Sequence, residues 1–416
     1  MQFEQTVTIK GTPLKHNQAC DTAAPAKAFK TRIWLIYILI MLWMGRNAIF
    51  IRQRSGGDYA AVDMLAMIQI GVVMMILVLL FFSPMADFLR QIKNSSLKFY
   101  FIYLVLGAAS ALWSINPIYS LYRAVEAFAL SAAILYFCAS AATPEEGVRR
   151  IQLIMWPTLL ANWVGLILLI GFSLQLRLNG FGAIATLTAC FFAAWILVGK
   201  GKNNGKELLQ AGLGLFFVLI SMSLASWWSF WFGVCYCAVF TRRKVLLVVL
   251  VLIGATLFFA VAQDTRKTLL VRDKEYENLG NMTGRKILWT DYMAASSERP
   301  LLGFGFAMGA REVGGRYTTN THNVFFAALV GVGWVGVAVL GMFFISLALE
   351  LLRYRHFRHP AWLACASALA AGCLNTMSVS ILGEQFTLAA MVFVALLGLH
   401  LVFLEQEKQK LLEKRL

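Results

Sequence analysis

Charged residues are scarce in this chain. Only 14% of its 416 residues are Asp, Glu, Lys or Arg, while 59% are hydrophobic. A soluble domain has about 25% charged and about 45–50% apolar residues, so a water-soluble fold of this length has no place for the apolar excess. Runs such as 245–261 carry no charge over a length that crosses a bilayer. Because backbone groups in lipid must bond internally, such runs predict membrane-spanning helices.

The sequence also lacks the patterns of several kinds of site. All of its seven cysteines except Cys20 fall inside apolar runs, with no disulfide framework and no zinc-binding spacing. There is no glycine-rich phosphate loop, no nucleophile elbow and no Asp-x-Asp pair. Asp273 and Glu275 stand among lysines and arginines, which is typical of a solvated charge run rather than a cation site. We expect neither a metal ion nor a cofactor.

Apolar segments recur along the chain and predict an all-α membrane protein with about twelve transmembrane helices. Their approximate ranges are 32–50, 60–83, 98–114, 121–141, 150–172, 181–199, 207–223, 227–240, 245–262, 324–350, 361–381 and 386–404. The eighth segment is short, and a re-entrant segment is the alternative there.

The distribution of positive charge predicts the topology. The net charge of +16 would suggest a nucleic-acid partner for a soluble protein, but here most basic residues lie in alternate short loops. By the positive-inside bias these loops and both termini face the cytoplasm, and no nucleic acid is expected as a partner. The expected divisions are a cytoplasmic tail 1–31, helices one to nine over 32–262, an outer loop 263–323, helices ten to twelve over 324–404, and a cytoplasmic tail 405–416.

Several arginines do not follow this rule, because they are expected close to the membrane on its outer side. They are Arg46, Arg52, Arg54, Arg123, Arg177 and Arg285. Such a cluster suits an anionic partner such as a phosphate. Contact with lipid headgroups explains any one of these residues equally well.

The long loop contains a helical pattern. Leu288, Trp289 and Tyr292 recur at helical spacing, which predicts an amphipathic helix ending before Arg299-Pro300. Arg285 and Trp289 are four residues apart and share a face of that helix. Arg285 can therefore hold a pyrophosphate while Trp289 anchors the helix at the membrane surface.

Two further positions carry ionisable groups where they are unusual. His322 is the one histidine of five expected at the outer membrane surface, where a neutral imidazole can take a proton from a hydroxyl. A histidine that caps the helix or lies at the interface is the alternative. Glu126 is expected inside the fourth span about one turn from Arg123, and an acid at that depth marks a functional site by default. An Arg123–Glu126 pair that only fixes helix packing is an equally good interpretation.

Four stretches of the chain are similar to motifs of a known family. They are Leu112-Trp113-Ser114-x-x-Pro117-x-x-Ser120-Leu121-x-Arg123; Arg177-Leu178-x-Gly180; Gly284-Arg285-x-x-Leu288-Trp289 with Arg299-Pro300-Leu301-x-Gly303-x-Gly305; and Thr321-His322-Asn323 with Gly331-x-Gly333. By these motifs the chain resembles the O-antigen ligase and O-antigen polymerase superfamily of bacterial membrane glycosyltransferases. The number of helices and the place of the long loop, between the ninth and tenth spans, also agree.

The resemblance implies a GT-C-like fold in the bacterial inner membrane, with a catalytic loop that contains short amphipathic helices and faces the periplasm. It implies transfer of a glycan from undecaprenyl pyrophosphate to an acceptor hydroxyl, with inversion and without metal or nucleotide. His322 and Arg285 are then the expected catalytic residues, one as base and the other as stabiliser of the leaving pyrophosphate. The expected substrate-binding residues are Arg177, Arg123, Glu126, Trp289 and Asn323.

One stretch departs from the family pattern. Family members carry a basic residue after a Ser-x-Ser in the eighth-helix region, whereas residues 221–228 here read Ser-Met-Ser-Leu-Ala-Ser-Trp-Trp. One expected pyrophosphate contact therefore lacks a residue, and Arg177 or Arg123 is the candidate to replace it.

The same departure favours a polymerase of a surface polysaccharide (O-antigen, capsule or exopolysaccharide) over a ligase that moves the glycan onto the lipid A-core of lipopolysaccharide. An enzyme that glycosylates proteins is a further alternative. A polysaccharide or lipid transporter is the alternative from another class. It predicts an inverted repeat and charges spread through the mid-membrane, and the sequence shows neither.

Overall fold

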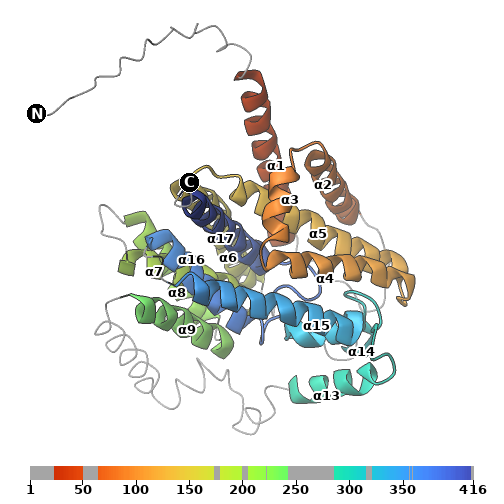
Figure 1. Cartoon of the computed structure of the whole chain (residues 1–416). Helices are drawn as coiled ribbons and strands as arrows, with labels where there is room; N and C mark the ends of the chain where they lie inside the picture. Colours follow the sequence, from red (N-terminus) through yellow and green to blue (C-terminus); the bar gives the residue numbers. More distant parts are fainter. Residues whose placement is uncertain are drawn as a thin grey trace, which may run out of the picture.

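Helices make up every regular element of the described chain. The computed structural model describes residues 23–49, 64–172, 179–198, 205–221, 223–241, 285–314, 321–355, 357 and 359–413. Its elements (Figure 1) are α1 (Ala23–Ile49), α2 (Met64–Phe81), α3 (Ala86–Lys93), α4 (Leu97–Ala109), the 3-10 helix η1 (Ser110–Leu112), α5 (Pro117–Ala139), α6 (Pro144–Phe172), α7 (Asn179–Val198), α8 (Gly205–Ile220), α9 (Leu224–Phe240), α13 (Arg285–Ser296), α14 (Gly309–Gly314), α15 (Val324–Arg353), α16 (Pro360–Asn375) and α17 (Leu388–Glu413). The all-helical prediction is confirmed over these residues.

Long apolar helices indicate a membrane-embedded protein. Among the described residues, α2, α5, α7, α15 and α17 are long and apolar enough to cross a membrane. Three shorter apolar helices cover Thr31–Gly45, Leu224–Phe240 and Pro360–Asn375. The predicted span 245–262 lies outside the described residues, so the count of twelve spans and the GT-C-like arrangement stay predictions.

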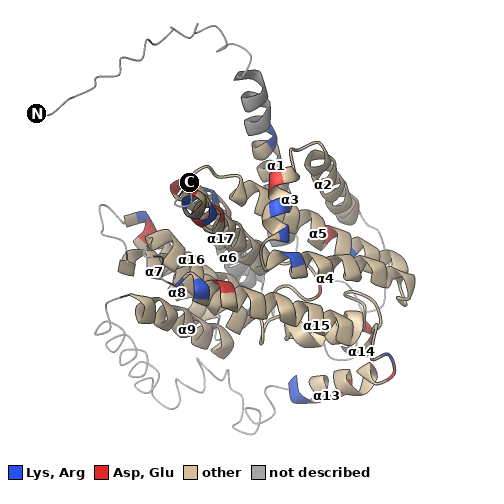
Figure 2. Ribbon diagram, viewed as in Figure 1, with Lys and Arg blue, Asp and Glu red and all other residues tan. Residues whose placement is uncertain are grey.

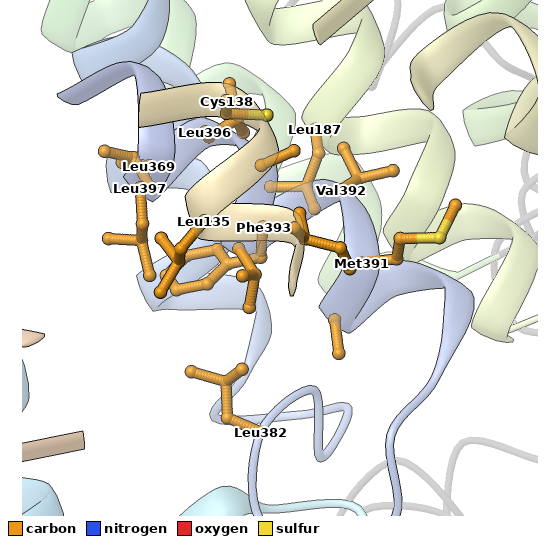
Figure 3. Close-up of a cluster of buried hydrophobic side chains, with 14 of the residues drawn as sticks. Leu135, Cys138, Leu187, Leu369, Leu382, Met391, Val392, Phe393, Leu396 and Leu397 are labelled. Atoms are coloured by element: carbon orange, nitrogen blue, oxygen red, sulfur yellow. The ribbon is translucent and has the colours of Figure 1, made fainter. Parts of the chain in front are cut away.

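The core lies where α5, α7, α16 and α17 meet. Figure 3 shows Leu135 and Cys138 of α5 close to Leu187 of α7, Leu369 of α16 and Phe393 of α17, and all five are buried. The apolar part of α17 is hydrophobic all round, so neighbouring helices can enclose it completely. Because α16 and α17 are both held in this core, the connection between them, 376–387, has fixed ends.

The helix ends gather on two faces of the molecule. On one face, which we call the loop face, lie the turn 110–117, the segment 297–314, the turn 321–323 and the connection 376–387. Hydrogen bonds join these segments: the Trp113 indole N–H donates to the Leu302 carbonyl (2.8 Å), and the Val324 N–H donates to the Thr376 carbonyl (3.1 Å). The opposite face, which we call the basic face, carries Lys98, Arg353 and Lys408, which line one hollow. Figure 2 shows Lys and Arg at the beginning of α4 and at the ends of α15 and α17.

A break in α15 joins the loop to the helical framework. Gly333 has φ +75° inside the helix, where only glycine is unstrained. The unwound stretch accepts hydrogen bonds that an intact helix would not: the Phe304 N–H donates to the Val330 carbonyl, and the Gly305 N–H donates to the Gly331 carbonyl, both at 2.8 Å. The predicted tenth span, 324–350, is therefore two helical pieces with the segment after Pro300 bonded between them.

The glycines of the Gly303-x-Gly305 motif allow this close approach. Gly305 has φ +109°, and a Cβ atom on it would lie 2.1 Å from the Ser114 Oγ atom. Beside it, the Ile115 N–H donates to the Phe304 carbonyl at 3.4 Å. Two of the motifs that carry the resemblance are therefore packed against each other, the turn before α5 and the glycine motif of the loop. About 190 residues separate them in the sequence.

Candidate functional site

His322 lies in a constrained turn on the loop face, directly before α15. It is half-buried and adopts φ +55°, a left-handed conformation that costs a non-glycine residue about 1 kcal/mol. Such strain persists only where the surroundings impose it. The neighbouring residues, Thr321 and Asn323, do so here.

Asn323 fixes the turn from the helix side. Its side-chain oxygen accepts hydrogen bonds from the N–H groups of Phe325 (2.8 Å) and Phe326 (3.3 Å), which makes it the N-cap of α15. Its side-chain NH₂ group donates to the Met377 carbonyl at 3.0 Å. The helix cap is therefore Asn323 and not His322. Both ends of the Asn323 amide are bound by the protein, and its contact with substrate stays a prediction.

Thr321 fixes the turn from the other side. Its backbone N–H donates to the Glu384 carboxylate at 2.9 Å, and its hydroxyl donates a second hydrogen bond to the same oxygen atom. Glu384 belongs to the connection between α16 and α17, which the core holds at both ends. A buried carboxylate with two donors from one residue is a rigid anchor, and it positions the backbone of the residue before His322.

Glu384 itself is buried, and burial raises its pKa to about 7, although the two donors from Thr321 and the positive charge of Arg311 act against the rise. The sequence reasoning missed this residue. In the sequence, Glu384 is recognisable only as an isolated acid in the short connection between the eleventh and twelfth predicted spans. This position does not predict its hydrogen-bond partner, because Thr321 is 63 residues away.

The predicted amphipathic helix of the loop is α13, and it is attached to the His322 turn. Leu288 and Tyr292 are buried against Ala310 and Val330, and the helix ends at Ser296, before Arg299-Pro300 as predicted. The Trp289 indole N–H donates to the Thr321 carbonyl at 3.1 Å. Its ring also stacks on Phe326, with ring centroids 5.2 Å apart.

Arg285 opens α13 one helical turn before Trp289 and on the same face. It is half-buried, and burial lowers its pKa from the ordinary arginine value, although a guanidinium remains charged in a protein. No salt bridge connects it to any other described residue. Trp289 is bonded to the residue before His322, and Arg285 lies one turn away on the same helix, so a role of Arg285 at the His322 turn stays a prediction.

A second arginine of the loop face, Arg311 in α14, lies over the Tyr119 ring at 4.7 Å. The Tyr119 hydroxyl accepts a hydrogen bond from Arg123 Nε at 3.1 Å. Arg311 also acts electrostatically on Glu384. No sequence pattern indicates Arg311, because it is one of many charges in the long loop.

Arg123 and Glu126 form an ion pair, with Arg123 Nη1 2.8 Å from Glu126 Oε2. Glu126 is completely buried and accepts two further hydrogen bonds, from the Trp43 indole N–H of α1 at 3.0 Å and from the Gln69 side chain of α2. One carboxylate thus holds three helices together. This geometry favours the packing interpretation of the pair, and the role of either residue in binding substrate stays a prediction.

We expect Glu126→Ala to destabilise the protein, because it leaves Arg123, Trp43 and Gln69 without their common acceptor. Removal of one partner of a buried ion pair costs about 3 kcal/mol. The midpoint of thermal unfolding of the purified protein in detergent measures the effect. Glu145→Ala is the matched control, because Glu145 is an exposed acid whose ion pair with His359 lies at the surface. Equal midpoints for Glu126→Ala and the wild type would contradict the packing role.

The remaining predicted residue, Arg177, lies outside the described residues, as do Asp273 and Glu275. The described residues contain no group of three His, Cys, Asp or Glu side chains that could hold a metal ion. Of the predicted site residues, the structure therefore brings Trp289 to the turn that holds His322 and Asn323, and Arg285 lies one helical turn from Trp289 on α13. It puts Arg123 and Glu126 in a separate pair that Tyr119 and Arg311 connect to the same face.

A family model described as O-antigen ligase matches residues 209–341. No curated protein matches the chain. The matched stretch contains the loop motif with Arg285 and Trp289, the Thr321-His322-Asn323 motif, and the glycines at the break of α15. These are the more specific of the motifs that carry the resemblance. The resemblance of the chain to the O-antigen ligase and polymerase superfamily is therefore confirmed.

Proposed function

We propose that this protein is a glycosyltransferase that moves a glycan from undecaprenyl pyrophosphate onto an acceptor sugar hydroxyl, with inversion at the anomeric carbon. The observation that carries the proposal is the attachment of α13 to the His322 turn through Trp289. Arg285 begins α13 one turn before Trp289, and both Arg285 and His322 belong to the stretch that the O-antigen ligase family model matches, which supports a shared site for the cation and the candidate base.

In the proposed reaction the acceptor hydroxyl oxygen attacks the anomeric carbon while the bond from that carbon to the pyrophosphate oxygen breaks. His322 takes the proton of the attacking hydroxyl. The electron pair of the broken bond leaves with the pyrophosphate, whose growing negative charge Arg285 stabilises. Bond formation and bond cleavage at the sugar therefore balance without a metal ion or a nucleotide.

The surroundings of the site suit a carrier with a polyprenyl tail. Large apolar side chains are exposed on the loop face close to the turn 110–117 and to the break in α15, where soluble proteins would place polar groups. They are Leu112, Ile118, Leu301, Leu302 and Trp334. A lipid-linked substrate can reach the site along such a surface without leaving the membrane.

The proposed location is the bacterial inner membrane, with the loop face in the periplasm and both termini in the cytoplasm. The support is the basic face, which lies at the opposite ends of α4 and α15 from the site. By the positive-inside bias, the basic face is the cytoplasmic one. Acceptor and carrier would then meet on the side where surface polysaccharides are assembled.

We expect Arg285→Ala to reduce transfer by about 100-fold, the usual effect of removing one group that stabilises a developing negative charge. The measurement is the surface glycan of a deletion strain that carries each variant, resolved on a gel at equal expression. Lys286→Ala is the matched control, because Lys286 is an exposed cation of the same helix. A normal glycan pattern with Arg285→Ala would contradict the assigned role.

The same deletion strain separates the two proposed activities. Loss of long chains, with single repeat units remaining, identifies a polymerase, which the missing basic residue in the eighth-helix region favours. Accumulation of full-length polymer on the lipid carrier, unattached to lipid A-core, identifies a ligase.

A further inference from the structure

A hollow on the basic face is lined by cations from three separate elements. It has a volume of about 270 Å³, and Lys98 of α4, Arg353 of α15 and Lys408 of α17 line it together with Ser95 and Ser96. The positive-inside bias explains why basic residues occur on this face. It does not explain why three of them, distant in sequence, surround one hollow.

The hollow lies at the level expected for lipid headgroups. The axes of α3 and α4 differ by 100° at the break between them, so that α3 lies along the membrane surface if α4 crosses the membrane. The sequence of α3 agrees, because Phe88 and Ile92 are buried while Asp87 and Arg90 are exposed. Ser95 and Ser96, which line the hollow, belong to this break.

The one acid of the hollow, Glu350, is bound by the protein itself. Its Oε1 atom accepts from the Ser96 N–H (2.6 Å), its Oε2 atom accepts from the Ser96 hydroxyl (2.9 Å), and His400 Nε2 lies 3.1 Å from the same Oε2 atom. Glu350 therefore joins α15, α17 and the α3–α4 break, and its carboxylate is occupied by these contacts. Lys408 Nζ also lies 3.9 Å from Glu405 Oε2 of its own helix. Three cations against these two acids still leave the site with a net positive charge.

Apolar side chains continue from the hollow along the outside of α15. Leu349 lines the hollow and is 60% exposed, and Ile345, one turn away, is 64% exposed. Ile102 and Val105 on α4 are also exposed. In a membrane these side chains face the acyl region, so a molecule with its anionic group in the hollow would lay its acyl chains beside them.

From these observations we infer that the hollow binds the headgroup phosphate of an anionic phospholipid of the surrounding bilayer. The cations supply the attraction for a phosphate, the exposed Asn94 side-chain amide of the α3–α4 break supplies a hydrogen-bond donor, and the exposed leucine and isoleucine side chains supply a surface for the acyl chains. This site is on the opposite face from the proposed glycosyltransfer site and does not depend on it.

Binding of dioctanoyl phosphatidylglycerol to the full-length protein in detergent tests the inference, with native mass spectrometry as the measurement. We expect the wild type to bind it at least about tenfold more tightly than dioctanoyl phosphatidylcholine, because several cations act on the phosphate together. The variant Lys98→Gln/Arg353→Gln/Lys408→Gln should lose this preference. Equal binding of the two lipids by the wild type would overturn the inference, and this outcome needs no variant.

The control variant is Arg90→Gln/Lys93→Gln/Lys410→Gln, which removes three exposed cations of α3 and α17 outside the hollow. It should keep the preference for phosphatidylglycerol within about twofold of the wild type. An equal loss in both triple variants would overturn the inference in favour of unspecific attraction. Displacement of the lipid by an equal concentration of glycerol 3-phosphate would also overturn it and assign the hollow to a soluble phosphate. The single variant Lys98→Gln, with an intermediate loss expected, serves if the triple variant does not fold.

Discussion

Substitution of His322 by glycine is expected to remove transfer while the protein keeps or gains stability. As the proposed base, His322 contributes about 100- to 10,000-fold to the rate, and neither glycine nor alanine can replace the imidazole. Its left-handed φ of +55° is unfavourable for a residue with a side chain and normal for glycine. His322→Gly therefore relieves strain, which alanine at the same position retains.

Two measurements check this prediction. The first is surface glycan made in a deletion strain by His322→Gly, His322→Ala and the control His359→Ala, a histidine at the N-cap of α16. The second is the thermal unfolding midpoint of the purified variants, where glycine should match or exceed the wild type and alanine should not exceed it. Normal glycan with His322→Gly would contradict the role of base. A lower midpoint for glycine than for alanine would contradict the strain.

Glu384→Gln is expected to stabilise the protein at pH 8 and to leave its stability at pH 5 nearly unchanged. The pKa of Glu384 is raised to about 7 by burial, from an ordinary value of 4.5. The folded protein therefore binds an extra proton at Glu384 between these values, so the contribution of Glu384 to stability is fully present below pH 4.5 and is lost as the pH rises through 7. The difference corresponds to about 3 kcal/mol.

Glutamine keeps a side-chain oxygen that accepts from the Thr321 N–H and hydroxyl, but it carries no charge at any pH. The unfolding midpoint of the variant, compared with the wild type at pH 5 and pH 8, should therefore differ only at the higher pH. Glu312→Gln, at an exposed acid of α14, is the matched control and should change neither value. A variant less stable than the wild type at pH 8 would show that the ionised carboxylate stabilises the turn, and would contradict the prediction.

Local patterns in the sequence predicted several parts of this site correctly. The spacing of Leu288, Trp289 and Tyr292 predicted α13 and its buried face, since both follow from helical periodicity alone. The turn at Trp113-Ser114-Ile115-Asn116-Pro117 also follows from local chemistry, because Asn116 caps α5 and Pro117 occupies its first turn. Contacts between distant segments were not predictable in this way.

Two contacts between distant segments illustrate this limit. One is the hydrogen bond between Thr321 and Glu384, and the other is the pair of hydrogen bonds that α1 and α2 donate to Glu126. Each depends on which helices become neighbours, and hydrophobic periodicity does not specify that. The break in α15 shows the same limit. The Gly331-x-Gly333 motif was recognisable, but a helix that begins at Val324 gives no local reason to unwind there, because the hydrogen bonds that replace those of the helix come from residues 304 and 305.

The backbone bonds of Phe304 and Gly305 to the break in α15 attach the segment after Pro300 to the helices, whereas α13 is attached through side chains. The segment after Pro300 shares backbone hydrogen bonds with α15 on one side and meets the turn before α5 on the other. It therefore behaves as part of the membrane-embedded scaffold. In the proposed reaction, admission of a bulky lipid-linked glycan requires displacement of α13, which the cluster around Leu288 and Tyr292, the Trp289 bond to Thr321 and the Tyr292 bond to Ala310 hold in place. The combined strength of these contacts then sets the balance between a closed site and an accessible one.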